Sequence, residues 1–152
     1  MTATCFNDRM GLSFIQSVDR TPEQPRKWKT GAGRFVEADH SFVAWAESKK
    51  TESFAEGHWE ATDDGRLCMI AAWTNRYGAQ DNRTCFVHLR DRGTIYQRRE
   101  PDGRWYIFKN YLNKPDDEFR KLSQVDSVSA KAERLKKSLE KGRIPRCDDA
   151  AC

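Results

Sequence analysis

The sequence contains no apolar run long enough to form a membrane-spanning helix, and it has few hydrophobic residues overall. Hydrophobic residues make up 38% of the chain and charged residues 33%, and the mean hydropathy is -0.89. A transmembrane segment is therefore excluded. Five Trp, four Tyr and eight Phe nevertheless supply enough large apolar side chains to exclude a wholly disordered polypeptide. The length of 152 residues suits one domain with a folded centre and polar ends.

The common catalytic signatures are absent as well. The chain has no G-x-S-x-G, no H-E-x-x-H, no glycine-rich phosphate loop and no Cys-x-x-Cys pair. Hydrolases, metalloproteases and nucleotide-dependent enzymes of the usual kinds are therefore disfavoured. His40, His58 and His88 fall on separate predicted strands or turns, without a second ligand at metal spacing. We expect no bound metal and no cofactor.

The five cysteines are an odd number, so at least one thiol stays free or pairs between chains if the others form bridges. Cys68 and Cys85 lie in the apolar, strand-like centre, whereas Cys5, Cys147 and Cys152 lie in polar ends. One internal disulfide is possible and would indicate an oxidising compartment. The first 19 residues lack the pattern of a secretion signal, so we expect a cytoplasmic protein or one whose signal was removed or replaced.

The composition divides the chain into three parts. Residues 1–30 are polar and form a predicted flexible N-terminal arm, residues 31–122 a β-rich domain, and residues 123–152 a basic helical tail. In the central part, short aromatic and β-branched runs alternate with turn residues, which predicts an antiparallel meander of about seven strands. The predicted strands are 33–37, 41–47, 53–61, 66–75, 83–90, 93–99 and 104–110.

The turns support the meander independently of hydrophobicity. Asp63-Asp64-Gly65, Asp91-Arg92-Gly93 and Pro101-Asp102-Gly103 each place Gly where a tight reversal needs a positive φ. In the last hairpin, the predicted register puts Tyr96 and Arg98 on one face, together with Trp105 and Ile107. Gln97 and Arg99 lie on the other face, together with Tyr106 and Phe108. Both faces then mix aromatic and polar side chains, which favours an all-β curved sheet or a small, partly open barrel over a simple sandwich.

The C-terminal part reads as helical. Residues 115–122 predict one short helical turn, and residues 129–141 an amphipathic helix with the apolar stripe Val128, Ala132, Leu135 and Leu139. Residues 131–146 hold seven Lys or Arg and two Glu, or +5, against +4 for the whole chain. This basic tail either contacts nucleic acid, an acidic membrane surface or a secretion receptor, or it docks its apolar stripe on the barrel.

Ordered segments of the chain resemble a small β-rich domain of unknown function found in secreted proteins of alphaproteobacteria: GRF, FVAW, EGHWEATDDGRLC, AAW, RTCF, GTIYQRREPDGRWYIFKN and DEF. The resemblance covers about Gly31 to Leu122, and the GTIYQRR-PDG-WY-F block is its most specific part. It implies an exported bacterial all-β domain with Cys68 bonded to Cys85, and it supplies no activity. The missing signal peptide and the basic tail depart from this pattern, so a periplasmic or secreted location is expected by resemblance, with a cytoplasmic one as the alternative.

The candidate binding residues lie in the last predicted hairpin: Tyr96, Arg98, Arg99, Trp105 and Tyr106, beside Gln97. Aromatic faces stack on ligands and Arg forks recognise carboxylates, so these residues predict a shallow face for a protein, a glycan or an anionic ligand. The competing interpretation is a cross-strand ladder in which Arg covers aromatic rings and stabilises the hairpin.

The sequence therefore favours a non-catalytic binding protein. One alternative is a small enzyme that combines Tyr96, Arg98 and Arg99 with a carboxylate such as Glu100; Glu56 and Glu60 are further candidate acids. Another is a basic protein that binds nucleic acid through its tail, which would require Arg98, Arg99 and the tail cations to form one continuous stripe.

Overall fold

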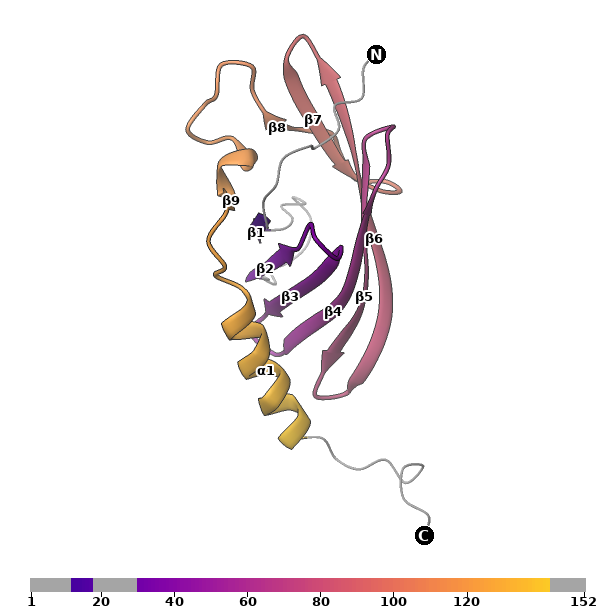
Figure 1. Cartoon of the computed structure of the whole chain (residues 1–152), viewed down its shortest axis with the longest axis vertical. Helices are drawn as coiled ribbons and strands as arrows, with labels where there is room; N and C mark the ends of the chain where they lie inside the picture. Colours follow the sequence, from indigo (N-terminus) through magenta and orange to yellow (C-terminus); the bar gives the residue numbers. More distant parts are fainter. Residues whose placement is uncertain (1–11, 18–29, 143–152) are drawn as a thin grey trace.

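A single curled antiparallel sheet makes up most of the molecule (Figure 1). The computed structural model describes residues 12–17 and 30–142. Within these residues the strands follow one another across the sheet in the order β8-β7-β6-β5-β4-β3-β2-β1-β9. The predicted fold class, an all-β meander in a curved, partly open sheet with a C-terminal helical extension, is confirmed. The elements are β1 (Leu12–Ser17), β2 (Thr30–Phe35), β3 (Ser41–Glu47), β4 (Glu52–Ala61), β5 (Arg66–Asn75), β6 (Gly78–Asp91), β7 (Thr94–Arg99), β8 (Tyr106–Lys109), the 3-10 helix η1 (Glu118–Lys121), β9 (Leu122–Ser123) and α1 (Ser129–Lys141).

The seven predicted strands correspond to β2 through β8. The predictions for β3 and β5 match residue for residue, because both strands are bounded by clear turn residues. β6 begins at Gly78 rather than at residue 83, and Asn75 pairs with Gly78 across a two-residue turn. The segment 78–82 lacks β-branched and aromatic residues, so only its pairing with β5 makes it a strand.

Part of the predicted N-terminal arm is a strand. β1 pairs with β2 in the register Phe14 opposite Gly33, and with β9 through Phe14 opposite Leu122. The apolar group that begins at Leu12 is too short to show a period, and its second partner lies more than a hundred residues away, so the local sequence did not reveal it. Thr30, the last residue of the predicted arm, begins β2, and residues 1–11 and 18–29 lie outside the described ranges.

Two of the three predicted glycine turns have the expected backbone. Gly65 and Gly93 both have φ of 86°, in the region that a side chain disfavours. The prediction was wrong for Gly103, which has no positive φ, while the Glu100–Pro101 peptide bond in the same turn is cis. Glycine is required there for space, because an added Cβ would lie 2.4 Å from the carbonyl oxygen of Arg99.

The sheet has two distinct faces. One face, here called the aromatic face, carries the main core cluster: the buried residues Phe42, Ala44, Ala55 and Ala71, against which Phe35, Trp59, Met69 and Trp73 pack. Strand alternation places these residues on one side, since Phe35 lies opposite Phe42 and Ala55 opposite both Ala44 and Trp73. The opposite side, here called the helix face, carries Val43 and Phe54 and is contacted by α1.

Helix α1 covers only part of the helix face. It contacts β3, β4 and β5, and it buries Ala132 and Leu135 of the predicted apolar stripe, next to Val128. Its Lys131 and Lys136 form ion pairs with Glu47 and Glu56, both at 2.8 Å. The expectation that the tail docks its apolar stripe on the sheet is therefore confirmed for residues 129–141, while the tail cations Arg143 and Arg146 lie outside the described residues.

The segment 110–121 joins the two ends of the sheet. It leads from β8 at one edge to β9 at the other, and Phe119 packs edge to face on Phe108 with ring centroids 6.0 Å apart. The buried Asp117 carboxylate accepts hydrogen bonds from the Asn110 backbone and side chain and from the Lys114 backbone. Burial raises the pKa of Asp117, but these hydrogen bonds outweigh it, so the pKa lies below its ordinary value.

Candidate binding surface

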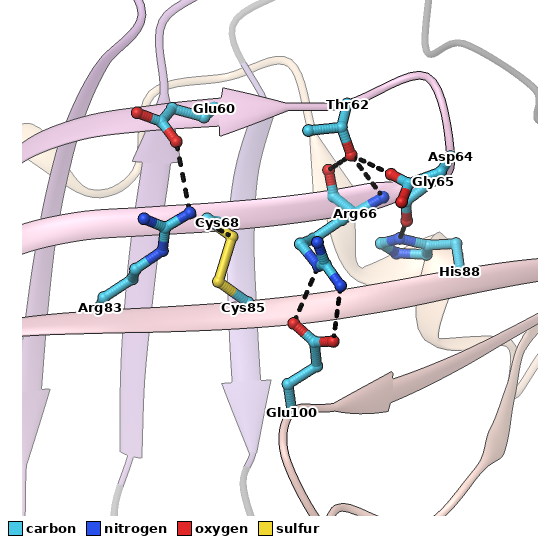
Figure 2. Close-up of polar contacts among 10 residues, drawn as sticks. All are labelled: Glu60, Thr62, Asp64, Gly65, Arg66, Cys68, Arg83, Cys85, His88 and Glu100. Atoms are coloured by element: carbon cyan, nitrogen blue, oxygen red, sulfur yellow. Dashed lines mark hydrogen bonds and ion pairs between the residues drawn. A yellow bond between two sulfur atoms is a disulfide. The ribbon is translucent and has the colours of Figure 1, made fainter.

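A disulfide joins β5 to β6 on the helix face (Figure 2). Cys68 lies directly opposite Cys85, with 4.0 Å between the Cα atoms. Gly65 and His88, three positions along the same ladder, form a hydrogen-bonded pair, so Cys68 and Cys85 occupy a non-hydrogen-bonded site, where opposite residues approach most closely. The pairing that the family resemblance implied is thereby confirmed.

Ion pairs flank the disulfide and engage the carboxylates considered as catalytic acids (Figure 2). Arg66 donates from Nε and Nη2 to the two oxygens of Glu100, at 3.0 and 3.1 Å. Glu60 lies 3.6 Å from Arg83, and Glu56 is held by Lys136. All three carboxylates are therefore bound by cations of the chain itself.

The predicted register of the last hairpin is confirmed, and it assembles a patch on the helix face. Tyr96 lies opposite both Leu89 and Ile107, and Arg98 lies opposite Val87. The Arg98 guanidinium stacks over the Trp105 ring, 5.1 Å from its centroid. Two rows thus cross the hairpin: one of Val87, Arg98 and Trp105, which lies directly before β8, and one of Leu89, Tyr96 and Ile107. They form the surface called the Arg98–Trp105 patch, made of Val87, Leu89, Tyr96, Arg98, Trp105 and Ile107.

The patch is apolar, accessible and beyond the part of the sheet that α1 contacts. Leu89, Ile107 and Trp105 are 40%, 43% and 46% exposed. Arg98 has no carboxylate partner in the described part of the chain, and its Nε is buried without a hydrogen-bond partner there. Large exposed apolar side chains around a cation without a counter-ion are features of an interaction surface rather than of a closed core.

The other two predicted binding residues, Arg99 and Tyr106, point to the aromatic face, because they alternate with Arg98 and Trp105 along their strands. Tyr106 belongs to a partly buried series of hydrogen bonds: its hydroxyl donates to Gln97 Oε1, and Gln97 Nε2 lies 2.6 Å from His88 Nε2. His88 Nδ1 lies 2.9 Å from the Gly65 carbonyl oxygen. The hairpin therefore separates the five candidates into a patch of three on the helix face and a pair on the aromatic face.

The acceptor atoms in this series of hydrogen bonds determine which ring nitrogen of His88 carries the proton. Because the Gly65 carbonyl can only accept, His88 Nδ1 carries the proton and Nε2 accepts from Gln97. Burial lowers the pKa of His88, against a smaller opposite effect of the Gly65 hydrogen bond. Burial, together with the charge of Glu118, raises the pKa of Tyr106 to about 12. Both groups are neutral at pH 7, so Tyr106, Gln97, His88 and Gly65 are linked by hydrogen bonds between uncharged groups.

Sequence reasoning missed the apolar half of the patch. Val87, Leu89 and Ile107 were included in predicted strands, but only polar and aromatic residues were considered as ligand contacts. Strand alternation in the RTCFVHLR segment was the available signal, since it places Val87 and Leu89 on the face of Cys85. Residues 12–17 and 30–142 contain no group of three His, Cys, Asp or Glu that could hold a metal ion.

The fold and the surface define a small all-β domain with one docked helix and a disulfide across its sheet. A family model described as a protein of unknown function, DUF995, matches residues 19–128. The chain belongs to this family. No curated protein and no solved structure shows a significant match. The matched residues include β2 through β9 and end directly before α1. None of the helices described is long and apolar enough to cross a membrane.

Proposed function

We propose that this protein is a non-catalytic binding protein and that the Arg98–Trp105 patch is its binding surface. The single observation that carries the proposal is the exposure of Leu89, Trp105 and Ile107 around Arg98, which has no carboxylate partner among residues 12–17 and 30–142, on the part of the helix face beyond α1. Exposed aromatic and Arg side chains grouped in this way are typical of the centres of protein interfaces.

An exported location is part of the proposal. The Cys68–Cys85 disulfide supports it, because disulfides persist in oxidising compartments such as the periplasm and are rare in the bacterial cytosol. A binding protein outside the cytoplasm also fits the resemblance to domains of secreted bacterial proteins.

The test is selection of ligands with and without the patch. The full chain, with its disulfide intact, is presented to a displayed library of random 12-residue peptides, and a Trp105→Ala, Ile107→Ser double variant serves as the control. We expect peptides that bind the unmodified protein and not the variant, with amide shifts in a labelled sample confined to β6, β7 and β8. Ligands that bind both proteins equally, or a library without binders, would overturn the proposal.

Binding to nucleic acid is less well supported. Two of the five cations in the described part of the tail, Lys131 and Lys136, are held by Glu47 and Glu56 of the sheet. The continuous stripe of cations that phosphate binding needs would have to cross these acidic residues.

A further inference from the structure

The chemistry of the Arg98–Trp105 patch restricts what it can bind; this inference rests on the proposed function of the patch. We propose that its partner is an extended acidic segment of another protein, with a carboxylate bound by Arg98 and, two residues away, a large apolar side chain bound between Leu89 and Ile107.

The first step concerns the charge of Arg98. Glu100, two residues further along the chain, is bound at both oxygens by Arg66, so Arg98 has no carboxylate partner among the residues that the structure describes. The surrounding segment 86–109 holds six Lys or Arg and three acids, one of which is this occupied Glu100. A segment with more cations than acids, and a guanidinium without a carboxylate partner among the described residues, attract an anionic group.

The second step concerns the shape of the group that is recognised. The Arg98 guanidinium lies over the Trp105 ring, and its planar fork can bind a carboxylate through two parallel hydrogen bonds. This contact covers one face of the Trp105 ring, which a sugar would need as a platform. The arrangement therefore favours a carboxylate over a neutral glycan.

The third step concerns spacing. Along β7 and β8, the row of Arg98 and Trp105 is two residues from the row of Tyr96 and Ile107, or about 6.5 Å. Side chains two positions apart in an extended peptide have the same spacing. A peptide lying along the strands would therefore place an Asp or Glu on the first row and an apolar side chain on the second, which is half exposed at Leu89 and Ile107.

The experiment uses the peptide library selected on the unmodified protein, followed by synthesis of the enriched peptides. We expect enrichment of Asp or Glu two positions from Leu, Ile or Phe. Arg98→Gln should weaken binding of these peptides about 10- to 100-fold, the usual effect of losing a charged hydrogen-bonded pair. Arg134→Gln, which removes an equal charge from the exposed side of α1, should change affinity less than twofold.

The outcomes separate this inference from the proposed function. If Trp105→Ala abolishes binding while Arg98→Gln does not, or if the enriched peptides are neutral or basic, the patch is a binding surface but the acidic partner is wrong. If neither substitution affects binding, or if no peptide is enriched, both proposals fail. Replacing the acidic residue of a bound peptide by its amide should cause the same loss as Arg98→Gln, and no further loss in that variant.

Discussion

The two halves of the helix face lie on one sheet surface but differ in whether their cations have acidic partners. Under α1, over β3 to β5, the cations Lys131 and Lys136 are matched to Glu47 and Glu56, and the apolar side chains Phe54 and Leu135 are buried. Over β6 to β8, Arg98 has no acidic partner within the described part of the chain, and three large apolar side chains are exposed. The covered half shows how this sheet surface looks when its partner is part of the chain, and our proposal assigns the uncovered half to a partner outside the chain.

The largest effect is expected in the covered half. Phe54→Ala should lower the free energy of unfolding by about 3–5 kcal/mol, because Phe54 is buried on the sheet face that α1 contacts and its removal leaves a cavity. The midpoint of urea unfolding at neutral pH measures this. A loss below about 1 kcal/mol would contradict the comparison, since burial of Phe54 on the face under α1 would then add little to the stability of the fold.

The disulfide lies at the border between the halves, and its removal should have the next largest effect. Cys68 and Cys85 are 17 residues apart, and closing a loop of this size stabilises a protein by about 3 kcal/mol. We expect the Cys68→Ala, Cys85→Ala variant to lose about 2–4 kcal/mol in urea unfolding. Adding reductant to the unmodified protein should reproduce the loss, and should leave the variant unchanged if the effect comes from this bond.

The series of hydrogen bonds that contains His88 predicts that the stability of the fold depends on pH. His88 has a folded pKa below its ordinary value of 6.5, so the unfolded chain binds a proton that the folded one does not. Stability should therefore be full above about pH 6.5 and fall as the pH drops from there towards the lowered folded pKa, with a slope of at most about 1.4 kcal/mol per pH unit. Urea unfolding between pH 5 and 7.5 measures this slope.

The control for that slope is a matched pair of variants. His88→Gln should flatten the dependence on pH between 5 and 6.5, and His58→Gln, at an exposed position, should keep it. An unchanged slope in His88→Gln would show that another group titrates in this range.

The smallest effect on stability is expected in the uncovered half. Trp105→Ala should cost less than about 1 kcal/mol, because the ring is 46% exposed and its contact with Arg98 is an exposed cation–π pair. The same urea measurement as for Phe54→Ala gives a direct comparison. A loss near 3 kcal/mol would place Trp105 in the packed structure and remove it from the binding surface.

Local pattern predicted those elements whose signal lies within a few residues. The run 66–75 has the residues of a strand, and the stripe of Ala132 and Leu135 defines α1 to the residue. The hairpin register predicted that Arg98 and Trp105 share a face, because it needs only the turn between them. Of the candidate site, the shared face of Arg98 and Trp105 could therefore be predicted from the sequence.

Features that depend on distant pairing could not be predicted. The Arg66–Glu100 pair joins residues 34 positions apart and requires the registers of β5, β6 and β7 together. Without it, Glu100 was a candidate catalytic acid beside Arg98 and Arg99. β1 was missed for the same reason, since β9 enters the sheet only after the chain has passed through every other strand.

The segment 110–121 also affects how the protein behaves at high concentration. A sheet that does not close exposes rows of amide and carbonyl groups at its first and last strands, and other chains can add to these rows. Here the terminal strands β8 and β9 have only four and two residues, and the loop held by Asp117 runs between them. Short edges joined by a loop offer little template for strand addition, so the molecule can present an apolar face to a partner without polymerising through its backbone.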